Sequence, residues 1–153
     1  MSAWFFHERA MSVCVQFDDS DLTICRLPPD HDVPPWAASG AFFSVTRSPD
    51  ELSVVCSTES VPVGVRSDAG WVALRVRGTL PLDEVGMMAA LAVPLARARI
   101  PLFPIATYDT DYLLIRRTAM ASARDALRLS GFSTEEVPRP ERESVRDHRT
   151  SGT

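Results

Sequence analysis

The sequence predicts an α+β fold in which helices cover one face of an antiparallel sheet. Residues 101–106 and 112–115 are apolar runs rich in β-branched and aromatic residues, and the polar stretch 107–111 separates them. This arrangement predicts a β-hairpin with two buried strands and a polar tip. Residues 82–98 and 118–130, on either side of the hairpin, carry helical patterns. Helices and strands in this order are typical of an α+β layer.

Composition limits the class of protein. The 153 residues are 45% apolar, which suits one ordinary domain or two small ones with a shared core. No apolar run approaches the roughly 20 residues that a membrane span needs, and the first nine residues do not resemble a signal peptide. The net charge of −4 comes with scattered arginines and no basic stripe. We therefore expect a cytoplasmic protein that binds neither membranes nor nucleic acids.

The reactive residue types indicate no catalytic or metal site. Three cysteines share no short spacing, and Cys25 and Cys56 lie in apolar runs typical of buried strands. No nucleophile elbow, phosphate loop or dinucleotide fingerprint occurs. Asp109 and Asp111 are close enough to share a strand face, but no apolar pocket is evident that would raise one pKa. We expect no catalytic residue, no metal, no cofactor and no enzymatic activity.

The N-terminal part of the chain is expected to be an extension, 1–21, followed by short strands. Asp18, Asp19, Ser20 and Asp21 form a polar run that interrupts regular structure. The patterns predict strands at 22–27, 41–46, 52–56 and 71–76, a helical turn at 35–38 and a short helix within 57–63. In the strand at 71–76, the face with Val72, Leu74 and Val76 is expected to be the buried one.

Two helices are predicted in the second part. Asp83 is the expected N-cap of a helix over 84–98. The second helix is expected to begin at Thr118 and to stop at Gly131. A final edge strand at 132–137 and a disordered polar tail at 138–153 complete the prediction. The expected buried stripe of the first helix is Val85, Met88, Ala92 and Leu95.

The two hairpins resemble each other, which indicates an internal repeat. With one gap, Val45-Thr46 aligns with Ala106-Thr107, and Val54-Val55 aligns with Leu114-Ile115. Two βαββαβ-like units, 22–68 and 69–137, account for the ordered chain. Each unit alone is at the margin of independent stability, so we expect them to share one continuous sheet or core.

The hairpin motifs carry a family resemblance. The sequence FFSVTRSPDELSVVC at 42–56, Gly70-Trp71 and IPLFPIATYDTDYLLI at 100–115 resemble tandem ACT-domain proteins. The chain is similar to CASTOR-type amino-acid sensors and to the regulatory ACT pairs of aspartokinases over about 22–137. The resemblance implies two ferredoxin-like βαββαβ units, with helices on one face of antiparallel sheets, that bind an amino acid where two units meet.

The resemblance also implies a ligand site. Residues 85–87 fall in the first turn expected for a helix, where N–H groups attract a carboxylate. A glycine inside a helix costs about 1 kcal/mol relative to alanine, so Gly86 suggests a packing or binding reason. In CASTOR-like proteins a glycine turn faces a Thr-aromatic-x-x-Asp hairpin tip. The implied ligand-binding residues are Val85, Gly86, Met87, Thr107, Tyr108, Thr110 and Asp111.

Three interpretations remain alongside one another, and the least favoured is an enzyme or accessory subunit that uses the pair Asp109 and Asp111. The first is a regulatory sensor that binds a free amino acid, forms a homodimer and acts on an unidentified protein partner. The second is a dimerisation or interaction module without a ligand. Pro81 favours the second, because it replaces an acidic or polar residue of the family. The residues at 107–111 also suit a simple solvated hairpin tip, and Gly86 also suits helix–sheet packing.

Overall fold

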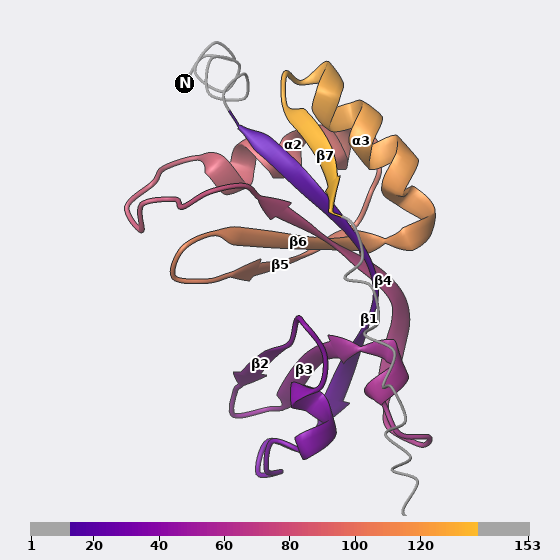
Figure 1. Cartoon of the computed structure of the whole chain (residues 1–153). Helices are drawn as coiled ribbons and strands as arrows, with labels where there is room; N and C mark the ends of the chain where they lie inside the picture. Colours follow the sequence, from indigo (N-terminus) through magenta and orange to yellow (C-terminus); the bar gives the residue numbers. More distant parts are fainter. Residues whose placement is uncertain (1–12, 138–153) are drawn as a thin grey trace, which may run out of the picture.

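The computed structural model describes residues 13–137, in which one sheet carries helices on one face (Figure 1). The expectations for residues 1–12 and for a disordered tail at 138–153 lie outside the described residues. The elements are β1 (Cys14–Leu27), η1 (Pro35–Ala38), β2 (Ser44–Arg47), β3 (Leu52–Ser57), η2 (Thr58–Ser60), β4 (Ser67–Val76), α2 (Met87–Arg97), β5 (Leu102–Ala106), β6 (Asp111–Arg116), η3 (Arg117–Ala119), α3 (Met120–Leu129) and β7 (Ser133–Val137).

The sheet of the described residues has the strand order β2-β3-β1-β4-β6-β5, with β7 beside β1. β7 runs parallel to β1, and the remaining neighbours pair antiparallel. β1 and β4 are the long strands, and their register extends from Val15↔Val76 to Cys25↔Ser67. These two strands therefore carry one continuous, curled sheet through the molecule (Figure 1). The α+β, ferredoxin-like fold class predicted from the sequence is confirmed.

β1 starts eight residues before the predicted strand, at Cys14 instead of Leu22. The polar run at 18–21 does not end the strand, because it forms an irregularity in which the register with β4 shifts. Asp18 Oδ1 accepts the backbone N–H of Ser20 at 2.8 Å. Arg117, at the start of η3, pairs with the carboxylates of Asp19 and Asp21. This distant arginine offsets the charge of the run, and a local reading of the sequence cannot detect it.

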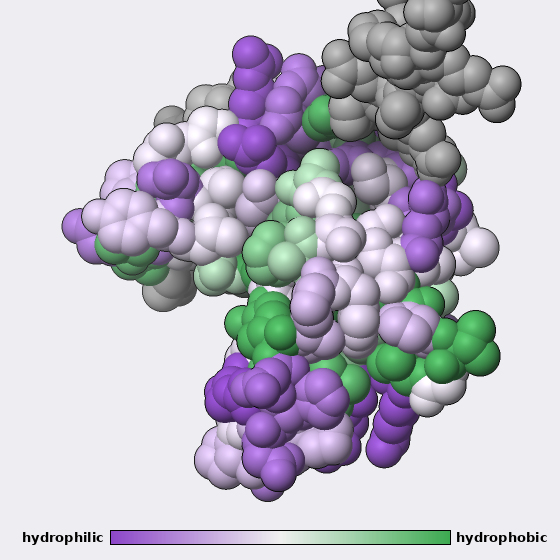
Figure 2. Space-filling view, turned by 60° about the horizontal axis from the view of Figure 1, so that its bottom comes forward, coloured by the Kyte–Doolittle hydropathy of each residue, from purple (hydrophilic) through white to green (hydrophobic). Residues whose placement is uncertain are grey.

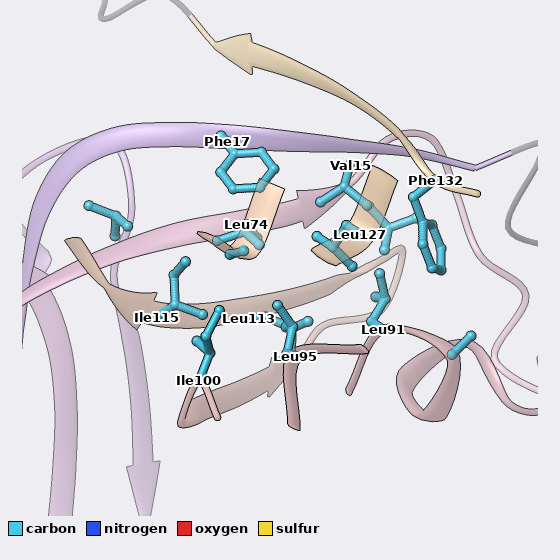
Figure 3. Close-up of a cluster of buried hydrophobic side chains, with 14 of the residues drawn as sticks. Val15, Phe17, Leu74, Leu91, Leu95, Ile100, Leu113, Ile115, Leu127 and Phe132 are labelled. Atoms are coloured by element: carbon cyan, nitrogen blue, oxygen red, sulfur yellow. The ribbon is translucent and has the colours of Figure 1, made fainter. Parts of the chain in front are cut away.

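The main core lies between the sheet and the two helices α2 and α3. Figure 3 shows that side chains from β1, β4 and β6 point toward side chains from both helices. Leu95 and Leu127 anchor the helices and have exposed fractions of 0%. Neither helix of the described chain is long and apolar enough to cross a membrane. The fully buried side chains of this core include Val15, Phe17, Val72, Leu74, Leu113 and Ile115.

A second apolar cluster occupies the sheet face opposite the helices. Trp71 and Ala73 of β4 belong to it, so both faces of β4 are buried there. The sequence pattern placed these two residues on a partly exposed face, which is wrong because the sheet curls over them. Phe42, just before β2, packs on Tyr112 of β6 with ring centroids 4.8 Å apart. This contact joins the β2–β3 side of the sheet to the β5–β6 side.

The N-terminal part of the sheet is covered by 3-10 turns in place of α-helices. η1 confirms the helical turn predicted at 35–38, and η2 lies within the short helix predicted at 57–63. Ala37 of η1 packs against Cys25, Leu52 and Cys56 in a third buried cluster. Figure 2, in which the bottom of Figure 1 comes forward, shows apolar residues in separate patches among polar ones. Scattered apolar residues of this kind are ordinary on protein surfaces.

The C-terminal elements follow the sequence prediction closely. α3 stops near Gly131, whose φ of 94° is the left-handed conformation typical of a helix end. Phe132 N donates to Leu127 O at 3.1 Å and closes this end. β7 lies within the strand predicted at 132–137. The predicted N-cap Thr118 is wrong, because it lies inside η3 and α3 begins at Met120.

Candidate functional site

A pocket of about 580 Å³ lies where the β5–β6 hairpin tip meets the start of α2. The segment between β4 and α2, residues 77–86, forms its third wall. Figure 1 places that segment and the hairpin tip on the same side of the molecule. The residues that line the pocket are Leu80, Pro81, Leu82, Glu84, Gly86, Met87, Met88, Ala89, Ala92, Ala106, Thr107, Tyr108, Thr110 and Asp111.

α2 begins at Met87, preceded by Gly86 as its N-cap. The predicted helix start at 84 with Asp83 as N-cap is wrong. Glu84 N donates to Pro81 O at 2.9 Å, and this turn keeps residues 81–84 outside the helix. Gly86 has a φ of 90°, a left-handed conformation that costs other residues about 1–2 kcal/mol. The glycine is therefore explained by its backbone conformation, and not by a position inside the helix.

Because α2 begins later than predicted, the side of the helix that is buried differs from the predicted one. Val85 lies outside the helix and is 68% exposed, so its place in the predicted buried stripe is wrong. Met88 and Ala92 are half-buried and line the pocket, and Met88 also packs against the main core. Leu95 is buried as predicted. The helix residues with the deepest burial are Met87, Ala90, Leu91, Pro94 and Leu95.

The start of α2, which lines the pocket, has backbone N–H groups without an acceptor within the helix. The first bond of the helix ladder runs from Ala90 N to Gly86 O at 2.9 Å. The N–H groups of Met87, Met88 and Ala89 precede that bond and have no acceptor in the preceding turn of the helix. All three residues line the pocket. Such groups, together with the helix dipole, attract a negatively charged group.

The hairpin tip is held by the hydroxyl groups of its two threonines. Thr107 Oγ1 donates to Thr110 O at 2.7 Å and accepts from Thr110 N at 3.2 Å. Thr110 is buried, and its Oγ1 donates to Val76 O at 2.8 Å, which ties the tip to the end of β4. Both hydroxyl hydrogens are thus engaged within the protein. These threonines shape the pocket wall, and only the remaining acceptor capacity of Thr107 is available to a ligand.

Asp111 and Tyr108 differ strongly in their surroundings. Asp111 is the first residue of β6, pairs with Ala106 of β5 and is half-buried. Tyr108 extends from the tip, and 78% of it is exposed. Because a strand holds Asp111, its carboxylate has a defined place in the pocket wall. Tyr108 forms part of the pocket mouth.

The charged side chains of the lining are all acidic. Asp111 and Glu84 contribute carboxylates, and no arginine, lysine or histidine is among the lining residues. Glu84 was not predicted as a site residue, because a carboxylate next to a helix start is common and carries no distinct signal. The apolar lining residues Leu80 and Leu82 were also missed, since the path of their segment depends on tertiary contacts. The pocket therefore favours ligands with a cationic group and an apolar portion.

Six of the seven residues predicted for the site line this one pocket. They come from the helix start and from the hairpin tip, segments that are separated in the sequence. Val85 is the exception and is not among the lining residues. Among residues 13–137 no group of three or more metal-ligating side chains occurs.

The side chains with shifted pKa values in the described chain lie away from this pocket. Burial raises the pKa of the Cys25 thiol to about 12, and the neighbouring Cys56 adds to the effect. Arg116 lowers the pKa of Asp68 through a two-atom ion pair, with distances of 2.6 and 3.0 Å. Arg116 also stacks on the Trp71 ring, 4.0 Å from its centroid. All of these groups therefore lie in the sheet, outside the lining of the pocket.

Comparison with known proteins identifies the family. A family model of the ACT domain matches residues 66–128, which include the whole pocket. Residues 66–128 of the chain are an ACT domain. A second family model, described as an N-terminal domain, matches residues 21–64 of this ACT-domain protein. The ACT-domain match covers the elements from β4 to α3, and the second match covers the end of β1 together with β2 and β3.

The relatives of this ACT-domain protein include solved structures and a human protein. The protein Atu0741 from Agrobacterium tumefaciens is 32% identical, with a TM-score of 0.78, and the alignment covers 83% of this chain and 95% of that one. The regulatory subunit of aspartate kinase from Thermus thermophilus shares the fold, with a TM-score of 0.54, 11% identity and coverage of 79% and 98%.

A curated relative is the "Putative protein CASTOR3P" from Homo sapiens, which is 28% identical over 87 residues. That alignment covers 48% of this chain and 53% of CASTOR3P. The ACT-domain protein described here therefore spans about half the length of the curated relative that it matches. The resemblance to CASTOR-type proteins and to aspartokinase regulatory domains that the hairpin motifs indicated is confirmed.

Proposed function

We propose that this ACT-domain protein is a regulatory sensor that binds a free amino acid in the pocket beside α2. One observation carries the proposal: the first residues of α2, whose N–H groups have no acceptor within the helix, and Asp111 line the same cavity. An α-amino acid has a carboxylate that the N–H groups of α2 can bind and an ammonium group that Asp111 can bind. The apolar lining residues then contact its side chain.

The α2 start is suited to the ligand carboxylate. The N–H groups of Met87, Met88 and Ala89 point out of the first turn, and Gly86 has no Cβ to obstruct an approach. Asp111 accepts hydrogen bonds from the ammonium group, and a charged hydrogen bond contributes about 1.5–3 kcal/mol. This division of roles accounts for a lining that holds carboxylates and no cationic side chain.

The proposal includes a homodimer in the cytoplasm that acts on a protein partner. Edge strands of a sheet present backbone groups that pair with another chain. β7 lies at such an edge, next to β1, and its outer side is available for side-by-side pairing in the described part of the chain. Light scattering during size-exclusion chromatography tests this point, because a homodimer has twice the mass of the chain.

The alternative function is an interaction module without a ligand. Two observations favour it: Pro81 lines the pocket where the family has an acidic or polar residue, and the Thr107 hydroxyl donates within the hairpin tip. Each of these features leaves one polar group fewer to hydrogen-bond the charged ends of an amino acid. An interaction module has no affinity for amino acids, so the two functions differ in a direct binding measurement.

A thermal-shift screen of the purified chain against the twenty L-amino acids at millimolar concentration tests the proposal. A ligand present at about 100 times its Kd adds about 2.7 kcal/mol of stability. For a chain of this length such a gain raises the melting temperature by several degrees. One or two amino acids that produce this rise support the sensor. Equal melting temperatures across the whole panel overturn it and favour the interaction module.

A further inference from the structure

The segment 77–86 has the construction of a hinged lid. Glycines with positive φ lie near both of its ends: Gly78 has a φ of 93° and Gly86 a φ of 90°. Glycine occupies left-handed and right-handed regions at similar cost, so each position permits a large backbone rotation. The strand β4 ends just before the first glycine, and α2 begins directly after the second. A flexible position therefore separates the segment from the rigid element on each side.

The centre of the segment is a preformed turn. Glu84 N donates to Pro81 O at 2.9 Å, and Pro81 restricts the backbone at the start of the turn. Leu80 N donates to Asp109 O at 2.7 Å and tethers the segment to the hairpin tip. The turn is therefore a compact unit between the tether at Leu80 and the left-handed Gly86.

Apolar side chains gather around the mouth of the pocket. Leu82, in the turn, is 71% exposed, and Tyr108, on the hairpin tip, is 78% exposed. Both residues line the same pocket from different elements. Val85, next to Gly86, is 68% exposed. The free energy falls when large apolar side chains leave water. This arrangement therefore favours a state in which Leu82 contacts Tyr108.

We propose that the turn 81–84 is a lid that swings on Gly86 and packs Leu82 against Tyr108 over the pocket, in a closed state that the free protein also visits and that a ligand favours. This inference rests on the proposed function for the identity of the ligand, but lid closure is testable without a ligand. Closure shields the ligand from water and strengthens its hydrogen bond to Asp111. Tyr108 belongs to the tip between β5 and β6. A closed lid that contacts Tyr108 therefore couples ligand binding to the position of these two strands.

Disulfide trapping tests the closed state directly. In a Cys14→Ser background, the pair Leu82→Cys and Tyr108→Cys is oxidised with diamide, and the products are separated by non-reducing electrophoresis and mass spectrometry. Cys25 and Cys56 are buried, and mass spectrometry distinguishes any disulfide between them from the engineered one. The matched control pairs Tyr108→Cys with Leu129→Cys, an 87% exposed position at the end of α3. In Figure 1, α3 lies on the other side of the molecule from the hairpin tip.

A lid predicts a disulfide within one chain for the first pair and none for the control pair. No disulfide within the chain, or a disulfide that joins two chains, overturns the lid. Both substituted side chains are highly exposed, so the fold should tolerate the changes. Melting curves of the reduced variants verify this point.

Hydrogen exchange of the unaltered protein provides a second test that separates the lid from the sensor. With an amino acid that raises the melting temperature, the amides of residues 80–86 should exchange at least about tenfold more slowly. The amides of residues 61–66, in a turn remote from the pocket, serve as the control. A raised melting temperature with unchanged exchange at 80–86 overturns the lid and leaves the sensor intact. A flat thermal-shift panel overturns the sensor, and the disulfide result then decides the lid.

Discussion

The backbone N–H of Leu80 donates to the carbonyl oxygen of Asp109 at 2.7 Å, and this bond joins two walls of the pocket. One wall is the segment before α2, and the other is the tip of the β5–β6 hairpin. The tip is fixed in turn to β4, because Thr110 Oγ1 donates to Val76 O at 2.8 Å. The pocket is therefore built on rigid strands with one hinged wall.

Gly86→Val should abolish amino-acid binding while the protein remains folded. A valine at a φ of 90° is strained, and its side chain enters the space beside the first N–H groups of α2. Backbone strain of this kind costs about 1–3 kcal/mol, which a domain of this length can tolerate. Isothermal titration with the amino acid found in the thermal-shift screen measures the loss.

Gly64→Val is the matched control for that variant. Gly64 has a φ of 92°, and a Cβ added there meets nothing within 4 Å. It carries a similar backbone strain at a site far from the pocket in sequence, between β3 and β4. Full affinity in Gly64→Val together with lost affinity in Gly86→Val assigns the effect to the pocket. Unchanged affinity in Gly86→Val contradicts the proposed site.

Asp111→Ala should weaken amino-acid binding by about 1–3 kcal/mol, the usual effect of a lost hydrogen bond to a charged group. The half-buried carboxylate at the start of β6 has a defined position, so its loss removes the acceptor for the ligand ammonium group. Titration calorimetry of both proteins measures the difference.

Asp125→Ala removes the same charge from the exposed side of α3 and is the control. An equal loss of affinity in both variants indicates a general effect of net charge, which contradicts a direct contact with Asp111. A loss that is confined to Asp111→Ala, and partly restored by Asp111→Glu, supports that contact.

The hairpin and the stop of α3 were predictable because short-range rules determine them. Apolar runs around a polar tip define β5 and β6, and Gly131 ends α3 through its own backbone conformation. β1 was only half predicted, because Arg117 compensates the acidic run through a contact that is distant in the sequence. The buried Trp71 face of β4 depends on the curl of the whole sheet, which no local pattern contains.

The pocket residues also divide into those that short-range sequence rules determine and those that depend on tertiary contacts. Residues of the hairpin tip and Gly86 were predictable, since each belongs to a short motif with a family resemblance. The helix start was misplaced because the turn closed by Glu84 N and Pro81 O competes with an N-cap at Asp83. The missed lining residues, Leu80 and Leu82, owe their position to that turn and to the tether on Asp109. Sequence patterns therefore identified the fixed walls of the pocket and missed the hinged one.

Arg99→Gly should raise the free energy of unfolding by about 0.5–1 kcal/mol. Arg99 follows α2 with a φ of 58°, and it is the described non-glycine residue with a positive φ. Its position is the usual one for glycine at a helix end, because Ile100 N donates to Leu95 O at 2.9 Å across it. Removing the Cβ relieves the strain, and the greater freedom of the unfolded chain offsets part of the gain.

Calorimetry should detect a rise of about 1–4 °C in the melting temperature of Arg99→Gly. Arg97→Gly, at the last residue of α2, is the paired control. It removes the same charge but places glycine in a helical conformation, which costs about 1 kcal/mol. A lower melting temperature in both variants shows that Arg99 contributes through its side chain and contradicts the backbone argument.

The buried thiol of Cys25 should make the protein less stable as the pH rises above about 8.5. Burial raises the pKa of this thiol to about 12 in the folded state, whereas an unfolded cysteine titrates near 8.5. Below the lower value both states keep the proton, so the stabilisation is complete there. Between the two values the unfolded state loses its proton first, so stability falls until the folded thiol also ionises near pH 12.

Urea unfolding at a series of pH values compares Cys25→Ala with Cys14→Ala. Cys25→Ala removes the titrating group, so its free energy of unfolding should fall less steeply from about pH 8 to about pH 10 than that of the unaltered protein. Cys14→Ala, at the start of β1, is the control for the loss of a thiol elsewhere in the chain. If the slope of Cys25→Ala equals that of the unaltered protein, the alkaline loss originates elsewhere and the Cys25 thiol ionises equally in both states.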